Sequence, residues 1–198
     1  MISLPVLLMD GAARVAALDA LRRGDLVLFP TETVYGIGAA SVHSAAVERL
    51  TVAKGRSPRK PFQRLIADAA VARRDSTGWD DRAERLARAF WPGPLTLVVP
   101  AKDGTLGWRV PRHEWLLGLL RELGEAIVAS SANPSNTPPP KTCAEAIRLL
   151  GTSVALAVDG GTAPEGEAST VAELTAHGLR VLRTGAVSET ALLQVLGP

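Results

Sequence analysis

Four cations crowd into one short segment of the chain. The segment reads Lys54-Gly55-Arg56-Ser57-Pro58-Arg59-Lys60-Pro61, in a chain whose formal net charge is only +2. Gly55 is typical of a helix end, and the two prolines prevent a helix from continuing. We therefore expect the cations on a stiffened, exposed loop, where they could bind a triphosphate or a nucleic-acid backbone. A loop that is merely solvated fits the same residues, so this segment alone does not decide between the two.

Hydroxyl side chains, further cations and one amide are scattered along the chain in a way that suits phosphate chemistry. They are Thr31, Thr33, Ser130, Ser131, Ser169, Thr170, Lys54, Arg56, Arg109, Arg183 and Asn133. Attack on a phosphate requires mainly positioning and charge neutralisation from the protein, together with a metal ion. Other chemistries find no support, because GxSxG, GxxxxGK[ST], CxxC and a His/Cys metal cluster are all missing from the sequence.

Length and composition suit one globular domain, or one domain with a small annex, and we expect a single domain over residues 1–198. The chain has 198 residues, 46% hydrophobic and 21% charged, which is enough for one substantial core. No apolar run reaches the roughly 18 residues of a membrane span, and residues 1–9 lack the features of a signal peptide. Cys143 is the only cysteine, so no internal disulfide can form. We expect a cytoplasmic protein with no membrane partner.

Helical periodicity and short apolar runs alternate along the chain. Helices are expected over 11–23, from Ser41 or Ser44 to Lys54, and over 80–90, 113–123, 142–151 and from Ser188 onward. Strands are expected over 26–29, 65–67, 95–99, 108–111, 126–129 and 154–158, with a hairpin of 171–174 and 179–182. This order favours an α/β fold with a mixed sheet over a pure Rossmann fold. Residues 30–38 are expected to form a ligand-binding loop at the end of a strand.

Seven short blocks of residues then occur in a fixed order over about residues 12–195. They are Pro30-Thr31-Glu32-Thr33-Val34-Tyr35-Gly36, Lys54-x-Arg56, Pro92-Gly93-Pro94-Leu95-Thr96-Leu97, Arg109-Val110-Pro111, Ser131-x-Asn133, Ser169-Thr170-Val171 and Arg183-x-Gly185. In this order they resemble the YrdC/Sua5 family of threonylcarbamoyl-AMP synthases, in its single-domain form. The resemblance implies a twisted mixed parallel/antiparallel sheet with flanking helices around an open, basic cavity.

The resemblance also implies an activity and its partners. The family joins L-threonine, bicarbonate and ATP into L-threonylcarbamoyladenylate and releases pyrophosphate. This nucleotidyltransferase product feeds the N6-threonylcarbamoyl modification of adenosine 37 in tRNA through a downstream tRNA threonylcarbamoyl transferase machinery. ATP is a substrate that brings Mg2+ with it, and no protein metal site is implied.

Matching positions carry the family's site residues onto this chain. ATP is assigned to Lys54, Arg56, Thr105, Ser131, Pro139 and Arg183. Threonine is assigned to Thr31, Arg109, the backbone at Ala129, and Ser169. Lys54, Arg56, Ser131 and Asn133 form the expected catalytic set. The chemistry agrees, because Lys54 and Arg56 can neutralise a triphosphate and Arg109 can bind a carboxylate through two parallel hydrogen bonds.

Two departures from the family pattern leave alternatives open. Phe62-Gln63-Arg64 stands where many members have a different strand, and Ser135-Asn136 replaces a commoner Ser-Gly. The same basic cavity could instead bind RNA, either weakly or as the main role of the protein. A protein of this fold could also serve ribosome or RNA maturation without synthase activity. Aromatic residues make up only 4% of the chain, which argues against RNA readout by base stacking.

Overall fold

The computed structural model describes residues 4–55 and 62–197, and its strands form one continuous sheet. The strand order is β1-β8-β2-β3-β7-β4-β6-β5-β9-β10. The strands are β1 Val6–Leu8, β2 Val27–Phe29, β3 Gly36–Ala40, β4 Gln63–Leu65, β5 Leu95–Ala101, β6 Gly104–Arg109, β7 Ile127–Ser131, β8 Leu156–Asp159, β9 Thr170–Thr175 and β10 Gly178–Arg183. The helices are α1 Gly11–Arg22, α2 Ser44–Ala53, α3 Ala69–Asp75, α4 Asp81–Phe90, α5 Glu114–Leu123, α6 Cys143–Leu150, the 3-10 turn η1 Gly151–Ser153, and α7 Glu189–Leu196.

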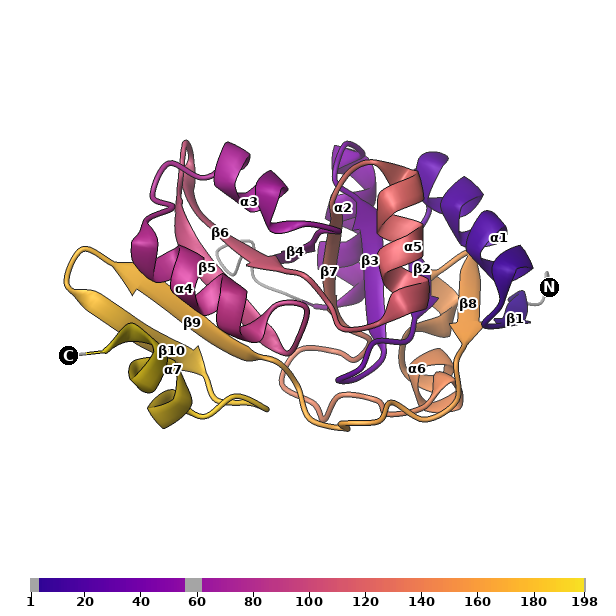
Figure 1. Cartoon of the computed structure of the whole chain (residues 1–198). Helices are drawn as coiled ribbons and strands as arrows, with labels where there is room; N and C mark the ends of the chain where they lie inside the picture. The colour runs from indigo at the N-terminus through magenta and orange to yellow at the C-terminus, as the bar shows by residue number, and fades with distance from the viewer. Residues whose placement is uncertain (1–3, 56–61, 198) are drawn as a thin grey trace.

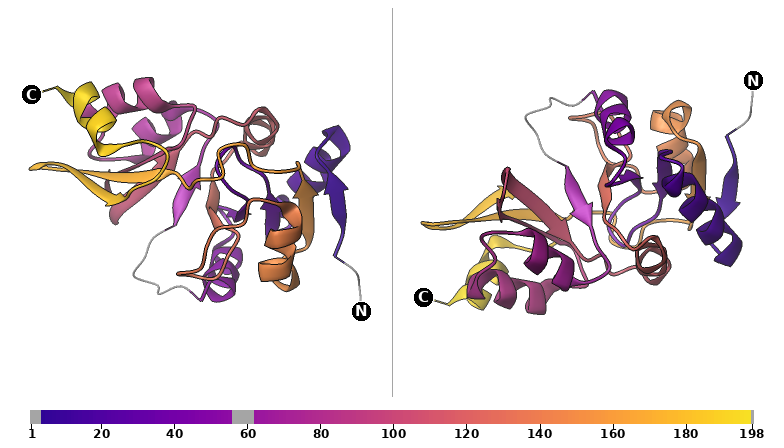
Figure 2. Two further views of the ribbon diagram at one scale, coloured as in Figure 1. Left: turned by 90° about the horizontal axis from the view of Figure 1, so that it is seen from below. Right: turned by 90° about the horizontal axis from the view of Figure 1, so that it is seen from above.

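The sheet mixes parallel and antiparallel neighbours, as the sequence predicts. Strand β8 runs parallel to both β1 and β2, whereas the pairs β2–β3, β3–β7 and β7–β4 across the middle are antiparallel. Parallel pairs return at β4–β6 and β5–β9. The strands at the two ends of the sheet are turned steeply relative to each other (Figures 1 and 2), as the right-handed twist of strands accumulates across a wide sheet.

Helices cover the two halves of the sheet differently. Around β2, β3 and β8, helices α1 and α5 form one core layer and helices α2 and α6 form another, on opposite faces. Around β5, β6 and β9, helices α3, α4 and α7 lie on one face, and Figure 2 shows no described helix on the other. Alternation along β5 sends Leu95 and Leu97 into the core under these helices, whereas Thr96 and Val98 face the uncovered side. This uncovered side holds the candidate site.

Local signals predicted the ends of most helices, whereas β6 begins four residues before the strand expected over 108–111. Asp10 caps α1 by accepting from the amide of Ala13 at 2.8 Å, and Thr142 begins α6 with a reciprocal capping box. The hairpin of β9 and β10 is confirmed. The cap of α2 is a correction, because α2 begins after His43, which makes no side-chain cap bond. Strand β4 lies two residues earlier than expected, and β1, β3 and α3 were not predicted.

Residues 36–40 form a buried central strand, so the end of the loop expected over residues 30–38 is wrong, whereas Thr33 and Val34 of that loop line a cavity described below. Strand β3 pairs with β2 on one side and β7 on the other, and all five of its residues are buried. Glycine is required at two positions: a Cβ on Gly36 would lie 2.8 Å from Phe29 Cε2, and one on Gly38 would lie 2.5 Å from Ile127 Cγ2. These glycines therefore make room for neighbouring side chains rather than for a ligand.

No helix in the described part of the chain is long and apolar enough to cross a membrane.

Candidate active site

Two adjoining cavities lie on the uncovered side of the sheet. The smaller has a volume of about 120 Å³ and the larger about 660 Å³. Both are lined by Val98, Ser130, Ser131, Ala168, Val171 and Arg183, so they form two compartments of one site. The larger volume falls in the range of roughly 300–1,000 Å³ that is typical of ligand sites, and the smaller would hold only a compact molecule.

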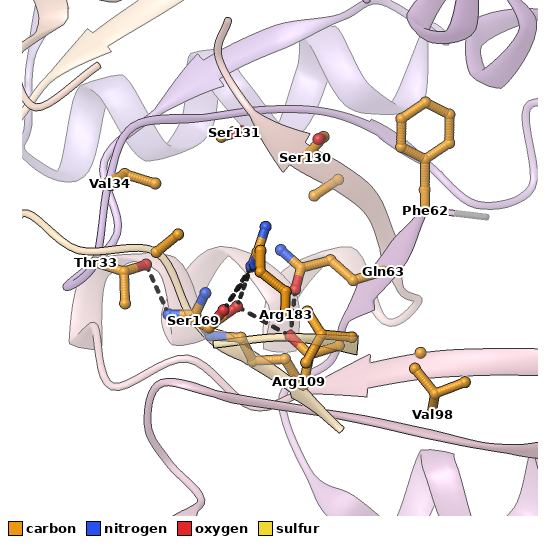
Figure 3. A pocket seen from close by; sticks show the side chains of 15 residues that line it. Thr33, Val34, Phe62, Gln63, Val98, Arg109, Ser130, Ser131, Ser169 and Arg183 are labelled. Atoms are coloured by element: carbon orange, nitrogen blue, oxygen red, sulfur yellow. Dashed lines mark hydrogen bonds between the residues drawn. The ribbon is translucent and has the colours of Figure 1, made fainter. Parts of the chain in front are cut away.

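Arg109 is the fixed cation of the small cavity. It ends β6, is only 2% exposed, and its Nη2 donates to Glu32 Oε1 at 2.8 Å and Thr33 Oγ1 at 2.9 Å. Its Nε donates to the carbonyl of Gly93 at 3.1 Å. Figure 3 shows the bond to Thr33 at the cavity wall. Because three partners hold the guanidinium, it is oriented before any ligand arrives, which suits binding of a carboxylate.

Glu32 is the buried counterion of this arginine. Burial alone would raise its pKa, but the charge of Arg109 and the backbone amide of Arg112, 2.9 Å from Oε1, outweigh that effect, so the pKa of Glu32 lies below its ordinary value. Glu32 is therefore ionised at neutral pH and offsets the charge of Arg109. Arg109 then contributes directed hydrogen bonds more than net positive charge.

Thr31 was expected to bind the ligand, but in the structure Thr31 closes a turn and Thr33 lines the small cavity. The hydroxyl of Thr31 donates to the carbonyl of Val34 at 2.7 Å and accepts from the amides of Thr33 and Val34, which closes a local turn. Thr31 is not among the lining residues of either cavity, whereas Thr33 lines the small one. The sequence alone could not show which of the two threonines faces the cavity, because the turn that Thr31 closes decides this.

Ser169 and Ala129 complete the small cavity with the residues expected there. Ser169 is 2% exposed, and Arg183 donates to its carbonyl at 2.6 Å and to its hydroxyl at 3.0 Å. Ala129 contributes from β7, next to Gln63 of β4. Arg109, Ala129 and Ser169, which the family pattern assigned to threonine, thus lie around one cavity. Phe62 and Gln63 also line it, and the sequence gave no role to either.

Lys54 is a buried cation, which corrects the expectation of an exposed loop. It is the C-cap residue of α2 and only 2% exposed. Its Nζ donates to the carbonyls of Ser131, at 2.6 Å, and Asn133, and its own carbonyl accepts from the amide of Ser135 at 2.9 Å. Lys54 therefore ties the end of α2 to the segment after β7 while it lines the large cavity. Arg56 and the other cations of the segment lie outside the described residues.

Asn133 holds the turn that borders the large cavity. Its side-chain nitrogen donates to the carbonyls of Thr137 at 2.7 Å and Pro134 at 3.0 Å, whereas its Oδ1 is buried without a hydrogen-bond partner. Asn136 in the same turn has φ 68°, a left-handed conformation that asparagine tolerates better than most residues. This explains why asparagine can stand where the family pattern has glycine.

The remaining ATP-assigned residues also line the large cavity. Thr105 is exposed on β6, Pro139 is half-buried, and Ser131 and Arg183 lie between the two compartments. Glu173 lines the same cavity and adds a carboxylate. The positive character of the whole cavity stays a prediction, because Arg56 is not described. Within the described residues, no cluster of His, Cys, Asp or Glu could hold a metal ion.

The fold and the site together define a class: an α/β ligand-binding protein built on a mixed sheet, with a small cavity and a large cavity on its uncovered face. The chain belongs to the Sua5/YciO/YrdC family. The family model, which carries the description "telomere recombination", matches residues 19–185. Escherichia coli YciO has the same fold, with a TM-score of 0.86 at 23% identity over 98% of this chain and 100% of that one.

Several relatives carry the name of one enzyme. The threonylcarbamoyl-AMP synthase of Bacillus subtilis is 38% identical and covers 94% of this chain, which spans 56% of that protein. The synthase of Thiobacillus denitrificans is 37% identical over 78% of this chain and 87% of its own. Pyrococcus abyssi Sua5 complexed with L-threonine superposes with a TM-score of 0.91 at 33% identity over 98% of this chain and 61% of that one. These relationships indicate an enzyme.

Proposed function

We propose that the protein is an L-threonylcarbamoyladenylate synthase, a nucleotidyltransferase that uses L-threonine, bicarbonate and ATP. The observation that carries the proposal is the small cavity with a pre-oriented arginine, directly beside a larger cavity that contains Lys54 and Arg183. The names of the relatives and the L-threonine complex of P. abyssi Sua5 support the same assignment.

L-threonine would occupy the small cavity. Arg109 would bind the α-carboxylate, while Thr33, Ser169 and the backbone at Ala129 would contact the hydroxyl and the amine. Thr33 replaces Thr31 in this proposal, because Thr33 lines the small cavity and Thr31 does not. The small volume of about 120 Å³ favours threonine over larger amino acids.

ATP would occupy the large cavity, with its phosphates near Lys54, Ser131 and Arg183 and its nucleoside toward Thr105 and Pro139. Arg56 is added from the sequence as a second phosphate ligand. Mg2+ would enter bound to ATP. The unpartnered Oδ1 of Asn133 is an acceptor suited to a cation or a donor on that ligand.

The chemistry requires two steps. The free amine of threonine adds to bicarbonate-derived carbon, and loss of water gives a carbamate with a C–N bond. A carbamate oxygen then attacks the α-phosphate of ATP, the bond to the β-phosphate oxygen breaks, and pyrophosphate leaves. The protein contributes alignment, charge neutralisation and exclusion of water, since carbamate and adenylate both hydrolyse readily. The product would serve tRNA modification through a separate transferase, in the cytoplasm.

An RNA-binding or RNA-maturation role is less well supported. The curated relatives are named as synthases, and aromatic residues make up only 4% of the chain, which offers few platforms for base stacking.

Pyrophosphate release tests the proposal. With L-threonine, bicarbonate and ATP together, we expect pyrophosphate and a threonylcarbamoyl adenylate, and removal of dissolved carbonate should abolish both. Serine should react more slowly because it lacks the methyl group. Full-rate pyrophosphate release with threonine and ATP in carbonate-free buffer would instead identify an aminoacyl-adenylate former and refute the proposal.

A further inference from the structure

We propose that Gln63 is a specificity-determining residue of the small cavity, where its side-chain nitrogen donates a hydrogen bond to a carboxylate-type oxygen of the substrate. This inference rests on the proposed function, because it takes the acid in that cavity to be threonine or its carbamate. Gln63 lies on β4 in the stretch Phe62-Gln63-Arg64, where the chain departs from the family pattern.

A chain of side-chain hydrogen bonds fixes the orientation of Gln63. Arg183 Nη2 donates to Ser169 Oγ at 3.0 Å, Ser169 Oγ lies 3.1 Å from Thr96 Oγ1, and Thr96 Oγ1 donates to Gln63 Oε1 at 2.7 Å. A guanidinium can only donate, and each hydroxyl has one proton. Since Thr96 gives its proton to Gln63, Ser169 must be the donor to Thr96. The protons therefore all point along the chain from Arg183 to Gln63.

This polarity divides the cavity into donors and acceptors. The amide oxygen of Gln63 is already used by Thr96, so its nitrogen is the group that faces the cavity, as Figure 3 shows. A side-chain NH2 can only donate. Ser169 has given up its proton and can offer a substrate only a lone pair. Gln63 thus suits a planar anionic oxygen, whereas Ser169 suits an ammonium or hydroxyl proton.

The residues around Gln63 leave room for such an oxygen. Gly107 lines the cavity beside Gln63, and a Cβ there would lie 3.3 Å from Thr96 Cγ2 and 3.7 Å from Gln63 Cα. A side chain at this position would crowd the cavity next to the amide. Arg109 is partly used by Glu32, Thr33 and Gly93. A neutral donor in the same cavity would add a hydrogen bond to a group with two charged oxygens. That group is either the α-carboxylate of threonine or the carboxylate of its carbamate.

Two substitutions of similar shape test the donor. Gln63→Met removes it and should weaken substrate binding roughly ten- to hundredfold, the usual effect of losing a hydrogen bond to a charged group. Gln63→Glu still accepts from Thr96 but faces the cavity with a carboxylate, so it should weaken binding further at neutral pH and recover as falling pH protonates it. Arg64→Met is the matched control, because Arg64 stacks 5.4 Å from the Trp108 ring centroid and lines a different cavity.

The measurement has two arms that distinguish the two oxygens. Calorimetric titration with L-threonine in carbonate-free buffer reports the α-carboxylate, and a loss of affinity for Gln63→Met there supports that partner. An unchanged titration with a raised KM for bicarbonate in the synthesis assay supports the carbamate. The inference is overturned if folded Gln63→Met has the threonine affinity and the bicarbonate KM of the wild type. It is also overturned if Gln63→Glu binds threonine as tightly as the wild type at neutral pH, because the wild-type amide would then face the cavity with its oxygen and not with its nitrogen.

The outcome is separable from that of the proposed function. If the wild-type protein makes the adenylate but the Gln63 variants are unaffected, only the role of Gln63 falls. If the wild-type protein neither binds threonine nor releases pyrophosphate, the proposed function falls first.

Discussion

Replacement of Lys54 by alanine should destabilise the protein as well as remove a phosphate ligand. The ammonium is 2% exposed and donates to the carbonyls of Ser131 and Asn133, which follow it by 77 and 79 residues. A hydrogen bond to a charged group contributes roughly 1.5–3 kcal/mol, and a buried carbonyl left unpaired costs about 1–3 kcal/mol. Allowing for overlap between these effects and for water entering the gap, we expect a loss of about 3–5 kcal/mol in the free energy of unfolding. That is a large share of the roughly 5–15 kcal/mol of a typical domain.

Thermal unfolding and ATP titration together test this reasoning. At about 2–4 °C per kcal/mol for a chain of this size, the melting temperature of Lys54→Ala should fall by roughly 10 °C. Lys54→Met is the matched variant, because it keeps most of the aliphatic stem and loses only the charge, so it should show most of the same loss. ATP should bind poorly to both. If Lys54→Ala loses turnover but melts within about 1 °C of the wild type, the ammonium stabilises only bound phosphate, and the buried bridge is not a structural element.

Three further predictions concern titratable groups. Glu32→Gln should raise the KM for threonine about tenfold or more, because Arg109 loses its charged partner. The free energy of unfolding should fall by up to about 3–5 kcal/mol. An unchanged KM in steady-state kinetics would contradict the orienting role of Glu32. His113 caps α5 by accepting from the amide of Leu116 at 3.4 Å, and burial lowers its pKa despite nearby Glu32. Folding thus favours the neutral form of His113. Its contribution to the free energy of unfolding should be complete above about pH 6.5, the ordinary pKa of histidine, and should be lost as the pH falls below that value. His113→Asn keeps a capping acceptor that does not titrate. Between pH 7 and pH 5, the free energy of unfolding measured in urea should therefore fall more for the wild type than for the variant, and an equal fall in both proteins would refute this. Burial raises the pKa of Cys143 to about 11, so iodoacetamide at pH 8 should modify the folded protein far more slowly than the urea-unfolded chain, whereas equal rates would show that the thiol is accessible.

The sequence determined the features that depend on neighbouring residues. Asp10, Asp80 and Thr142 cap helices because their side chains reach backbone amides two or three residues on, and this reach is independent of the rest of the fold. Short apolar runs predicted β5 and β7, and two strand-like segments around His177-Gly178 predicted the β9–β10 hairpin, for a similar reason. The ordered blocks of the family pattern predicted a mixed sheet, and the matching positions Arg109, Ala129 and Ser169, assigned to one ligand, lie around one cavity in the structure.

The tertiary structure decided everything that depends on residues far apart in the chain. Lys54 looks like a solvated loop cation until the carbonyls after β7 are placed against it. The glycines of β3 look like a ligand loop until Phe29 and Ile127 are packed beside them. The amide of Gln63 acquires a direction only when β4, β5 and the segment leading into β9 bring it into line with Thr96 and Ser169. Burial and hydrogen-bond polarity are properties of such assembled surroundings, and a linear pattern of residue types does not contain them.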